Sequence, residues 1–201
     1  GVLKDLRRAW ELNEKAVYQG FPDALYLKSY CFKNGICVVQ NNAQAYAWLD
    51  NAAKMGSSDA LADFACAYLF GDDTYNIKKD ASKAFAYASR AADLGHVEGL
   101  CYKGLCLKLG IGTTLDKEKA FQYFYQAASL GNSGAQCEVG EAYLKGEGVE
   151  KNYSEGQKYI SAAAQSQNSR AYKLMGDIYY YGLGVEESNV DAASWYEKAL
   201  N

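Results

Sequence analysis

Glycine residues recur at a nearly constant spacing along the chain, and this period constrains the fold more than any other feature. One series opens successive segments in steps of 36, 39, 36 and 36 residues, with a glutamine in the fifth place: Gly20, Gly56, Gly95, Gly131 and Gln167. A second glycine follows each opener by 15 residues, at Gly35, Gly71, Gly110, Gly146 and Gly182. A period of about 20 to 50 residues is typical of repeat proteins, in which each unit packs against its neighbours.

Each period contains two segments in which small residues keep fixed places. The first has a small residue four places after the opener, at Ala24, Ala60, Gly99, Ala135 and Ala171. The second repeats the pattern A-x-x-W/Y-x-x-x-A, as in Ala45, Trp48 and Ala52. Small residues at helical spacing let two helices approach closely, while aromatic residues at neighbouring phases fill the space between pairs. Since one helical hairpin cannot bury its apolar faces alone, the sequence predicts an all-α, right-handed superhelical solenoid of about five hairpins.

We expect one continuous repeat array over residues 1–201, with repeats at 20–55, 56–94, 95–130, 131–166 and 167–201. Residues 2–19 have the spacing of a second helix that lacks its first-helix partner. The three extra residues of the second repeat are expected in the loop between its helices, within 71–84. No polar capping helix ends the chain, which suggests a segment of a longer protein or a short array whose end a partner covers. The uncapped ends would also permit self-association.

These repeats resemble the Sel-1-like repeat, a relative of the tetratricopeptide repeat, over residues 20–201. The fourth repeat, AQCEVGEAYLKGEGV at 135–149, follows the family pattern almost fully, and AYKLMGDIYYYGLGV at 171–185 matches as well. Cys37 and Asp73 stand where the second loop glycine belongs, and Lys28 and Lys103 occupy a usually aliphatic place. We expect these departures to affect local loop geometry and not the fold. The resemblance implies a binding protein, because family members act as adaptors and scaffolds, and some are immunity proteins that block a toxin.

Charge and hydropathy exclude two kinds of partner. The formal net charge is -3, and lysine and arginine are scattered among aspartate and glutamate. No basic face is therefore available to neutralise nucleic-acid phosphates. No apolar run approaches the length of about 20 residues that a membrane span needs, so we expect no direct membrane insertion.

Six cysteines raise the question of disulfides or a metal site: Cys31, Cys37, Cys66, Cys101, Cys106 and Cys137. No C-x-x-C pair occurs and His96 is the only histidine, so the spacing does not support a metal site. A cysteine-rich, secreted branch of the family that this chain resembles links the two helices of each hairpin by a disulfide, but here the second helices contain no cysteine. We therefore expect free thiols and a reducing compartment, either the cytoplasm or a host cytosol into which the protein is delivered. Whether a native signal sequence precedes Gly1 is left open.

No motif predicts catalysis or a cofactor. The Gly-x-Gly loops, such as YLKGEGV at 143–149, lack the preceding strand, the longer glycine series and the lysine of a phosphate-binding loop. We interpret them as corners between helices. His96 lies near a helix start without a serine or cysteine partner, which favours a capping or surface role. The paired carboxylates Asp72 and Asp73 lie in a turn. We expect no catalytic residue, no cofactor and no metal, and hence a protein that is not an enzyme.

The surface of the first helices is the remaining candidate for function. By analogy with tetratricopeptide arrays, these helices line the concave face, and places 3, 6, 10, 13 and 14 after each opener form one stripe. The partner-binding candidates on it are Tyr26, Tyr30, Lys33, Cys66, Leu69, Phe70, Cys101, Leu105, Lys108, Leu109, Glu141, Leu144, Lys145, Lys173, Asp177, Tyr180 and Tyr181. An apolar middle with tyrosines and charges at its ends is what a protein-binding groove needs. The alternative, that the same residues fill the concave centre against one another, stays open.

These observations favour a non-enzymatic protein–protein interaction module, an adaptor or scaffold that binds a protein or peptide partner on its concave face. An inhibitor or immunity protein that blocks a toxin or secreted enzyme is the first alternative. A β-lactam-binding or hydrolysing enzyme, as suggested for the cysteine-rich branch, is the second. The absence of a nucleophile with an adjacent base in the sequence disfavours it.

Overall fold

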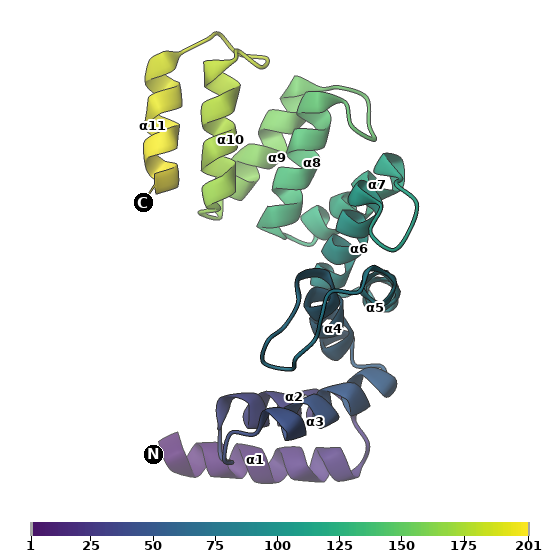
Figure 1. Cartoon of the computed structure of the whole chain (residues 1–201). Coiled ribbons are helices and arrows are strands. Elements are labelled where there is room, and N and C mark those ends of the chain that lie inside the picture. Colours follow the sequence, from purple (N-terminus) through teal and green to yellow (C-terminus); the bar gives the residue numbers. More distant parts are fainter. Residues whose placement is uncertain (1, 201) are drawn as a thin grey trace. The chain divides into compact units, whose positions relative to one another are not determined.

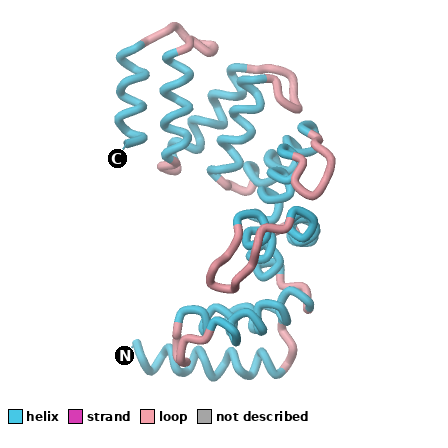
Figure 2. The backbone as a smooth tube through the Cα atoms, viewed as in Figure 1, coloured by secondary structure: helices cyan, strands magenta, loops and turns pink. Residues whose placement is uncertain are grey.

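The computed structural model describes residues 2–200, and this part of the chain consists of helices and connecting loops. It contains eleven α-helices and one isolated bridge between Asp72 and Ile77. Figure 2 shows the helices joined by loops, without a strand. The prediction of an all-α fold is confirmed. The helices are α1 (Val2–Tyr18), α2 (Pro22–Asn34), α3 (Asn42–Lys54), α4 (Ser58–Phe70), α5 (Ala81–Asp93), α6 (Val97–Leu109), α7 (Lys117–Ser129), α8 (Ser133–Lys145), α9 (Tyr153–Gln165), α10 (Ser169–Tyr180) and α11 (Asn189–Leu200).

Consecutive helices pair into hairpins whose two members lie side by side. Figure 1 shows α2 beside α3, α8 beside α9 and α10 beside α11, and α4 packs on α5 in the same way. α1 lies along the α2–α3 hairpin and contacts α2. The chain divides into two compact units, residues 1–102 and 103–201, and the division falls within α6. We call them the first unit and the second unit.

Alanines at the predicted spacing form the contact between the helices of the hairpins. Ala45 in α3, Ala84 in α5 and Ala163 in α9 have 0% of their surface exposed. Phe64 of α4 completes the core of the first unit, and its ring packs on Tyr87 of α5 at a centroid distance of 5.1 Å. Burial of these apolar groups is the main term that stabilises a stack of hairpins.

Side chains cap the starts of the second helices, and glycines end several first helices. In α3, α5, α7 and α9 a side-chain oxygen before the helix accepts a hydrogen bond from an N–H of the first turn. The four capping residues are Asn41, Asp80, Asp116 and Asn152. Gly146 ends α8 with a φ of 72°, and its N–H donates to the carbonyl oxygen of Ala142. The interpretation of YLKGEGV as a corner is therefore correct.

The second loop glycine also makes a contact between repeats. Gly148 has a φ of 74°, and a Cβ atom there would lie 2.1 Å from the carbonyl oxygen of Lys117, which starts the preceding second helix. Only glycine lets the loop approach that backbone so closely. In the first loop Cys37 takes this place with a left-handed φ of 61°, and its thiol donates to the Leu6 carbonyl oxygen at 3.5 Å. At this departure from the family pattern the loop keeps a left-handed backbone without glycine.

The three extra residues of the second repeat lie between α4 and α5, as predicted. This loop covers residues 71–80, whereas the loop between α2 and α3 covers 35–41 (Figure 2). Asp72 and Ile77 exchange backbone hydrogen bonds of 2.9 and 2.8 Å, and Ile77 is buried in the core of the first unit. Tyr75, at the turn of this loop, packs on the same core with its ring centroid 5.9 Å from that of Tyr46. The insertion thus adds an aromatic side chain for which the other repeats have no equivalent.

Candidate partner-binding surface

The face of α2 carries the first predicted stripe residues, and it is hollowed. Tyr26, Tyr30 and Lys33 line a hollow of about 330 Å³ together with Asp63 of α4 and Tyr75 of the 71–80 loop. The Lys33 ammonium lies 4.9 Å from the centre of the Tyr75 ring, within the range of a cation–π interaction. Two helices and one loop therefore bring aromatic and charged groups to one place.

A second hollow of about 300 Å³ adjoins the first, because Tyr26 and Asp63 line both. Its other lining residues come from α4, from α6 and from the residue before α6: Asp59, Ala62, His96, Glu98 and Tyr102. We call the two hollows together the tyrosine–aspartate groove, defined by Tyr26, Tyr30, Asp59, Asp63, Tyr75 and Tyr102.

Asp63 lies where the two hollows meet, and its environment differs from that of an ordinary surface carboxylate. Solvent reaches the side chain, yet desolvation by the surrounding protein raises the pKa of its carboxyl group. A hydrogen bond from Tyr26 and the charge of Lys33 reduce this rise in pKa without cancelling it. Burial likewise raises the pKa of Tyr26, and the Asp63 carboxylate adds to that shift because it disfavours a phenolate nearby. Asp63 is thus exposed to solvent and at the same time partly desolvated by the protein.

His96 caps a helix and contacts the carboxylates of the groove. Its Nδ1 accepts a hydrogen bond from the Gly99 N–H at 3.3 Å, in the first turn of α6. Nε2 lies 3.2 Å from Asp59 Oδ1, and Nδ1 lies 3.5 Å from Glu98 Oε2. Since Nδ1 accepts, a neutral imidazole carries its proton on Nε2 and donates it to Asp59. The expected capping role of His96 is therefore observed.

The other stripe residues of the first unit divide between surface and core. Phe70 is 56% exposed at the end of α4, whereas the neighbouring Leu69 is buried. Cys66 and Cys101 are partly buried, and Cys66 shares a hydrogen bond with the Tyr102 hydroxyl. Leu69 contributes to packing and offers no surface to a partner.

In the second unit the stripe carries charges that are paired with one another. Glu138 accepts hydrogen bonds from Lys108 at 2.6 Å and from Arg170. Glu141 accepts from Arg170 as well, and from Lys145 at 2.8 Å. Desolvation acts to raise the pKa of Glu141, but the hydrogen bonds from Lys145 and Arg170 outweigh it, so the pKa is lowered. The carboxylates of this network are therefore compensated by basic side chains of the same unit.

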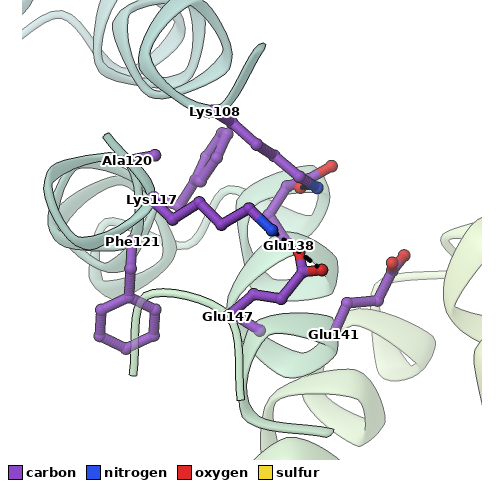
Figure 3. Close-up of a pocket in the computed structure, with 9 residues that line it drawn as sticks. Lys108, Lys117, Ala120, Phe121, Glu138, Glu141 and Glu147 are labelled. Atoms are coloured by element: carbon purple, nitrogen blue, oxygen red, sulfur yellow. Dashed lines mark hydrogen bonds and ion pairs between the residues drawn. The ribbon is translucent and has the colours of Figure 1, made fainter. Parts of the chain in front are cut away.

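Figure 3 shows the cavity beside this network. Lys117, at the start of α7, reaches toward Glu147 with an N···O distance of 3.3 Å, and Ala120 and Phe121 of α7 supply apolar lining. The cavity has a volume of about 20 Å³, the space of roughly one water molecule. It is too small for a side chain of a partner. The second unit therefore has a packed charge network on its stripe, whereas the stripe of the first unit has the tyrosine–aspartate groove.

The remaining apolar candidates of the second unit differ in exposure. Leu144 is buried and Leu105 is partly buried. Half or more of the surface of the other three is exposed: Leu109, Tyr180 and Tyr181.

The remaining charged candidates of α10 are paired. Lys173 lies 3.5 Å from Asp177, one turn further along the helix. Asp177 also accepts a hydrogen bond from the Tyr196 hydroxyl at 2.8 Å, so it joins α10 to α11.

Three groove residues lie outside the predicted stripe: Asp63, Tyr75 and Tyr102. Asp63 and Tyr102 each stand seven places after their openers, Gly56 and Gly95, and an α-helix puts place 7 on the same face as places 3, 10 and 14. That signal was present in the sequence and would have identified both. Tyr75 lies in the inserted loop, where the repeat provides no equivalent position, so no periodic signal could have found it.

The described residues contain no group of three or more His, Cys, Asp or Glu side chains that could hold a metal ion. The six cysteines all lie within residues 2–200, and none of them is in a disulfide. Burial raises the pKa of Cys106 and Cys137 to about 11, so both are protonated thiols at neutral pH. Within residues 2–200 no helix combines the length and the apolar character that a membrane crossing requires.

Comparison with known proteins gave matches to one family and to several solved structures. The family model described as Sel1 repeat matches residues 1–21, 22–57, 58–96, 99–132, 133–168 and 169–201. A Sel1 repeat protein from Oxalobacter formigenes is 28% identical with a TM-score of 0.81, and the match covers 98% of this chain and 80% of that chain. A search of curated proteins gave no match.

Two further solved structures share the fold. A protective antigen present in uropathogenic Escherichia coli strains, which displays an SLR fold, is 26% identical with a TM-score of 0.77. That match covers 96% of this chain but 40% of the antigen, so this chain spans less than half of its length. The immunity protein Pa5087 from Pseudomonas aeruginosa is 24% identical with a TM-score of 0.57, over 89% of this chain and 65% of that chain.

Proposed function

Because this chain belongs to the Sel1 repeat family, whose members are generally non-enzymatic protein-interaction modules, we propose that it binds a protein or peptide partner on the first-helix face of its repeats. The tyrosine–aspartate groove is the observation that carries this proposal. Its two adjoining hollows, of about 330 and 300 Å³, are lined by four tyrosines and by carboxylates. Tyrosine suits such a site because its ring offers a large apolar surface with few rotatable bonds, and its hydroxyl adds a hydrogen bond.

Exposure separates residues that can contact a partner from residues that fill space. Leu69 and Leu144 have 9% and 7% of their surface exposed, which fits the filler interpretation. Tyr30 and Phe70 have 49% and 56% exposed, so no neighbour within the described chain covers them. Exposed aromatic side chains beside polar ones are the pattern of a binding surface. A surface of this kind supports the adaptor or scaffold role that we propose.

Site-specific photocrosslinking tests this proposal. A photoreactive phenylalanine analogue replaces Tyr30 in the groove or, as a control, the exposed Ala86 of the second helix α5. Irradiation in cells of the source organism should attach a defined partner at position 30 and not at position 86. Equal crosslinking at both positions, or at position 86 alone, would contradict a first-helix binding face.

An inhibitor that blocks a toxin or secreted enzyme would use the same groove, and it differs from an adaptor in what happens to the partner. An inhibitor abolishes the partner's activity at one equivalent of added chain, whereas an adaptor leaves that activity in place. Titration of the crosslinked partner with the purified chain therefore distinguishes the two. Turnover of a chromogenic β-lactam by the same preparation would contradict the non-enzymatic part of the proposal.

A further inference from the structure

We propose that the tyrosine–aspartate groove recognises a basic segment of a protein partner, with an arginine side chain held at the carboxylates of Asp59 and Asp63. This inference rests on the proposed function and adds to it the chemistry of the partner. Tyr26 and Tyr102 line the same hollow as the two carboxylates. A guanidinium placed there meets paired acceptors and aromatic faces together, which is the combination that arginine binds best.

The groove holds more negative than positive charge. Among the residues that line the second hollow, Asp59, Asp63 and Glu98 carry carboxylates, and the one basic side chain is His96, which lies between Asp59 and Glu98. In the first hollow Lys33 acts on Asp63 electrostatically, but its ammonium is held over the ring of Tyr75. Within residues 5–102 no lysine or arginine forms an ion pair with Asp63. A cationic partner would supply the missing counter-charge.

The second unit shows what the same helix position looks like when the chain supplies its own cation. Glu138 stands seven places after Gly131, as Asp63 stands seven places after Gly56. Glu138 accepts hydrogen bonds from Lys108 and Arg170, so its charge is compensated within the unit. Asp63 instead has the Tyr26 hydroxyl as its hydrogen-bond partner. The difference between equivalent positions points to a ligand at Asp63 and to none at Glu138.

The surroundings of Asp63 strengthen its attraction for a cation. Protein atoms around it remove part of the water that would screen its charge, and this desolvation is the largest cause of its raised pKa. At the same time solvent reaches the side chain, so an incoming group can reach it too. Charge pairs in such a partly dehydrated place interact more strongly than pairs on an open surface.

The size of the groove fits a peptide segment. The two hollows have volumes of about 330 and 300 Å³ and share Tyr26 and Asp63 as lining residues, so they adjoin. Spaces of this order accept groups of the size of a drug-like ligand. A long side chain in one hollow and the neighbouring residue of an extended segment in the other would fill them.

Selection of random dodecapeptides displayed on phage tests the inference with the full chain. The bait is the wild type, Asp63→Asn, Tyr30→Ala or, as a matched control, Asp50→Asn on the second helix α3. Asp63→Asn removes the charge and keeps the size of the side chain. Circular dichroism and thermal melting establish that each bait is folded. Selected peptides are then synthesised with arginine or with citrulline, which keeps the shape and removes the charge, and their Kd values are measured by fluorescence anisotropy.

We expect the wild type and Asp50→Asn to select peptides enriched in arginine. Replacement of arginine by citrulline, and Asp63→Asn, should each weaken binding by about tenfold or more. Lysine in place of arginine should bind with intermediate strength, because it keeps the charge and loses the planar pair of donors.

The outcomes separate this inference from the proposed function. The inference of a basic partner is overturned if the selected peptides are not enriched in basic residues, or if they bind Asp63→Asn as tightly as the wild type. If Tyr30→Ala still weakens those peptides, the proposed first-helix binding face stands. If no peptide is selected, or if selected peptides respond to neither variant, both proposals fall.

Discussion

At the scale of the residue, Lys28 shows how a charged group replaces an aliphatic one. The side chain of Lys28 is 11% exposed, and its ammonium lies 2.8 Å from Glu14 of α1. It also lies 4.2 Å from the centre of the Trp48 ring of α3. The ion pair and the cation–π contact compensate for removing the charge from water, so Lys28 joins three helices.

We predict that Lys28→Ala lowers the free energy of unfolding by about 2–3 kcal/mol, because it removes the ion pair and leaves a gap between Trp48 and α1. Lys28→Met keeps the length and the apolar contacts of the side chain and should cost less than about 1 kcal/mol. Urea unfolding of both variants measures the two values. Equal losses for Ala and Met would show that the charge, and not the packing, is what counts.

Glu141 gives a pH-dependent prediction. Its pKa is lowered below the ordinary glutamate value of 4.5, because the hydrogen bonds from Lys145 and Arg170 outweigh desolvation. A lowered pKa in the folded state stabilises above the ordinary pKa, and the effect is lost as the pH falls through the lowered value. Glu141→Gln should therefore destabilise by about 2 kcal/mol at neutral pH, and the difference from wild type should shrink below pH about 4.

Urea unfolding at neutral and acid pH measures this change in the Glu141→Gln effect. The control is Glu155→Gln in α9, where the Lys158 partner lies 3.3 Å away and the Glu155 side chain is 38% exposed, compared with 14% for Glu141. That variant should stay within about 0.5 kcal/mol of wild type at every pH. A Glu141→Gln effect of constant size across pH would contradict the role of the carboxylate charge.

At the scale of the element, close helix contacts depend on particular glycines. Gly140 of α8 faces α9, and a Cβ atom there would lie 2.4 Å from Ile160 Cγ1 and 3.0 Å from the carbonyl oxygen of Gly156. Gly134 lies in the same helix, but its Cβ would meet only the Asn132 side-chain oxygen, at 3.3 Å. Alanine substitutions at these two positions therefore distinguish the effect of helix propensity on stability from the effect of helix packing.

We predict that Gly140→Ala destabilises by about 1–3 kcal/mol, although alanine is the better helix former, because the added methyl group pushes α8 from α9. Gly134→Ala should leave stability unchanged or raise it by up to about 1 kcal/mol. Thermal and urea unfolding of the two variants measure these changes in stability. A stabilised Gly140→Ala would mean that the two helices are not in close contact.

The helices of this chain could be predicted from the sequence because their determinants lie within one period. The openers, the loop glycines and the A-x-x-W/Y pattern located the hairpins, and the extra residues were placed in the correct loop. Contacts between neighbouring repeats were harder, since the approach of Gly148 to Lys117 and the meeting of Tyr26 with Asp63 join residues about 30 to 40 positions apart. The exposure of single stripe residues, such as Leu69 and Phe70, depended on the same contacts.

At the scale of the whole molecule, the two units distribute charge differently on their first helices. In the second unit Glu138 and Glu141 are paired with basic side chains, which are Lys108, Lys145 and Arg170. Asp63 of the first unit forms no such pair with a lysine or arginine of residues 5–102. The net charge of -3 conceals this difference, because it sums over both units.

Salt should therefore weaken partner binding through the first unit. We predict that the Kd rises as ionic strength increases from about 0.05 to 0.5 M, because screening acts on the attraction between the carboxylates and a basic partner. Asp63→Asn should make this dependence shallower, and Asp50→Asn should leave it unchanged. Titrations at several salt concentrations give the slopes. A Kd that does not change with salt would indicate an apolar partner.

Carboxyl footprinting of the partner complex tests the central claim, that the partner occupies the tyrosine–aspartate groove, most directly. A water-soluble carbodiimide and an amine label exposed aspartate and glutamate side chains, and mass spectrometry locates the labels. We predict that partner binding protects Asp59, Asp63 and Glu98, while Glu11 of α1 and Glu155 of α9 react as before. Unchanged labelling of Asp59 and Asp63 in a saturated complex would contradict the account.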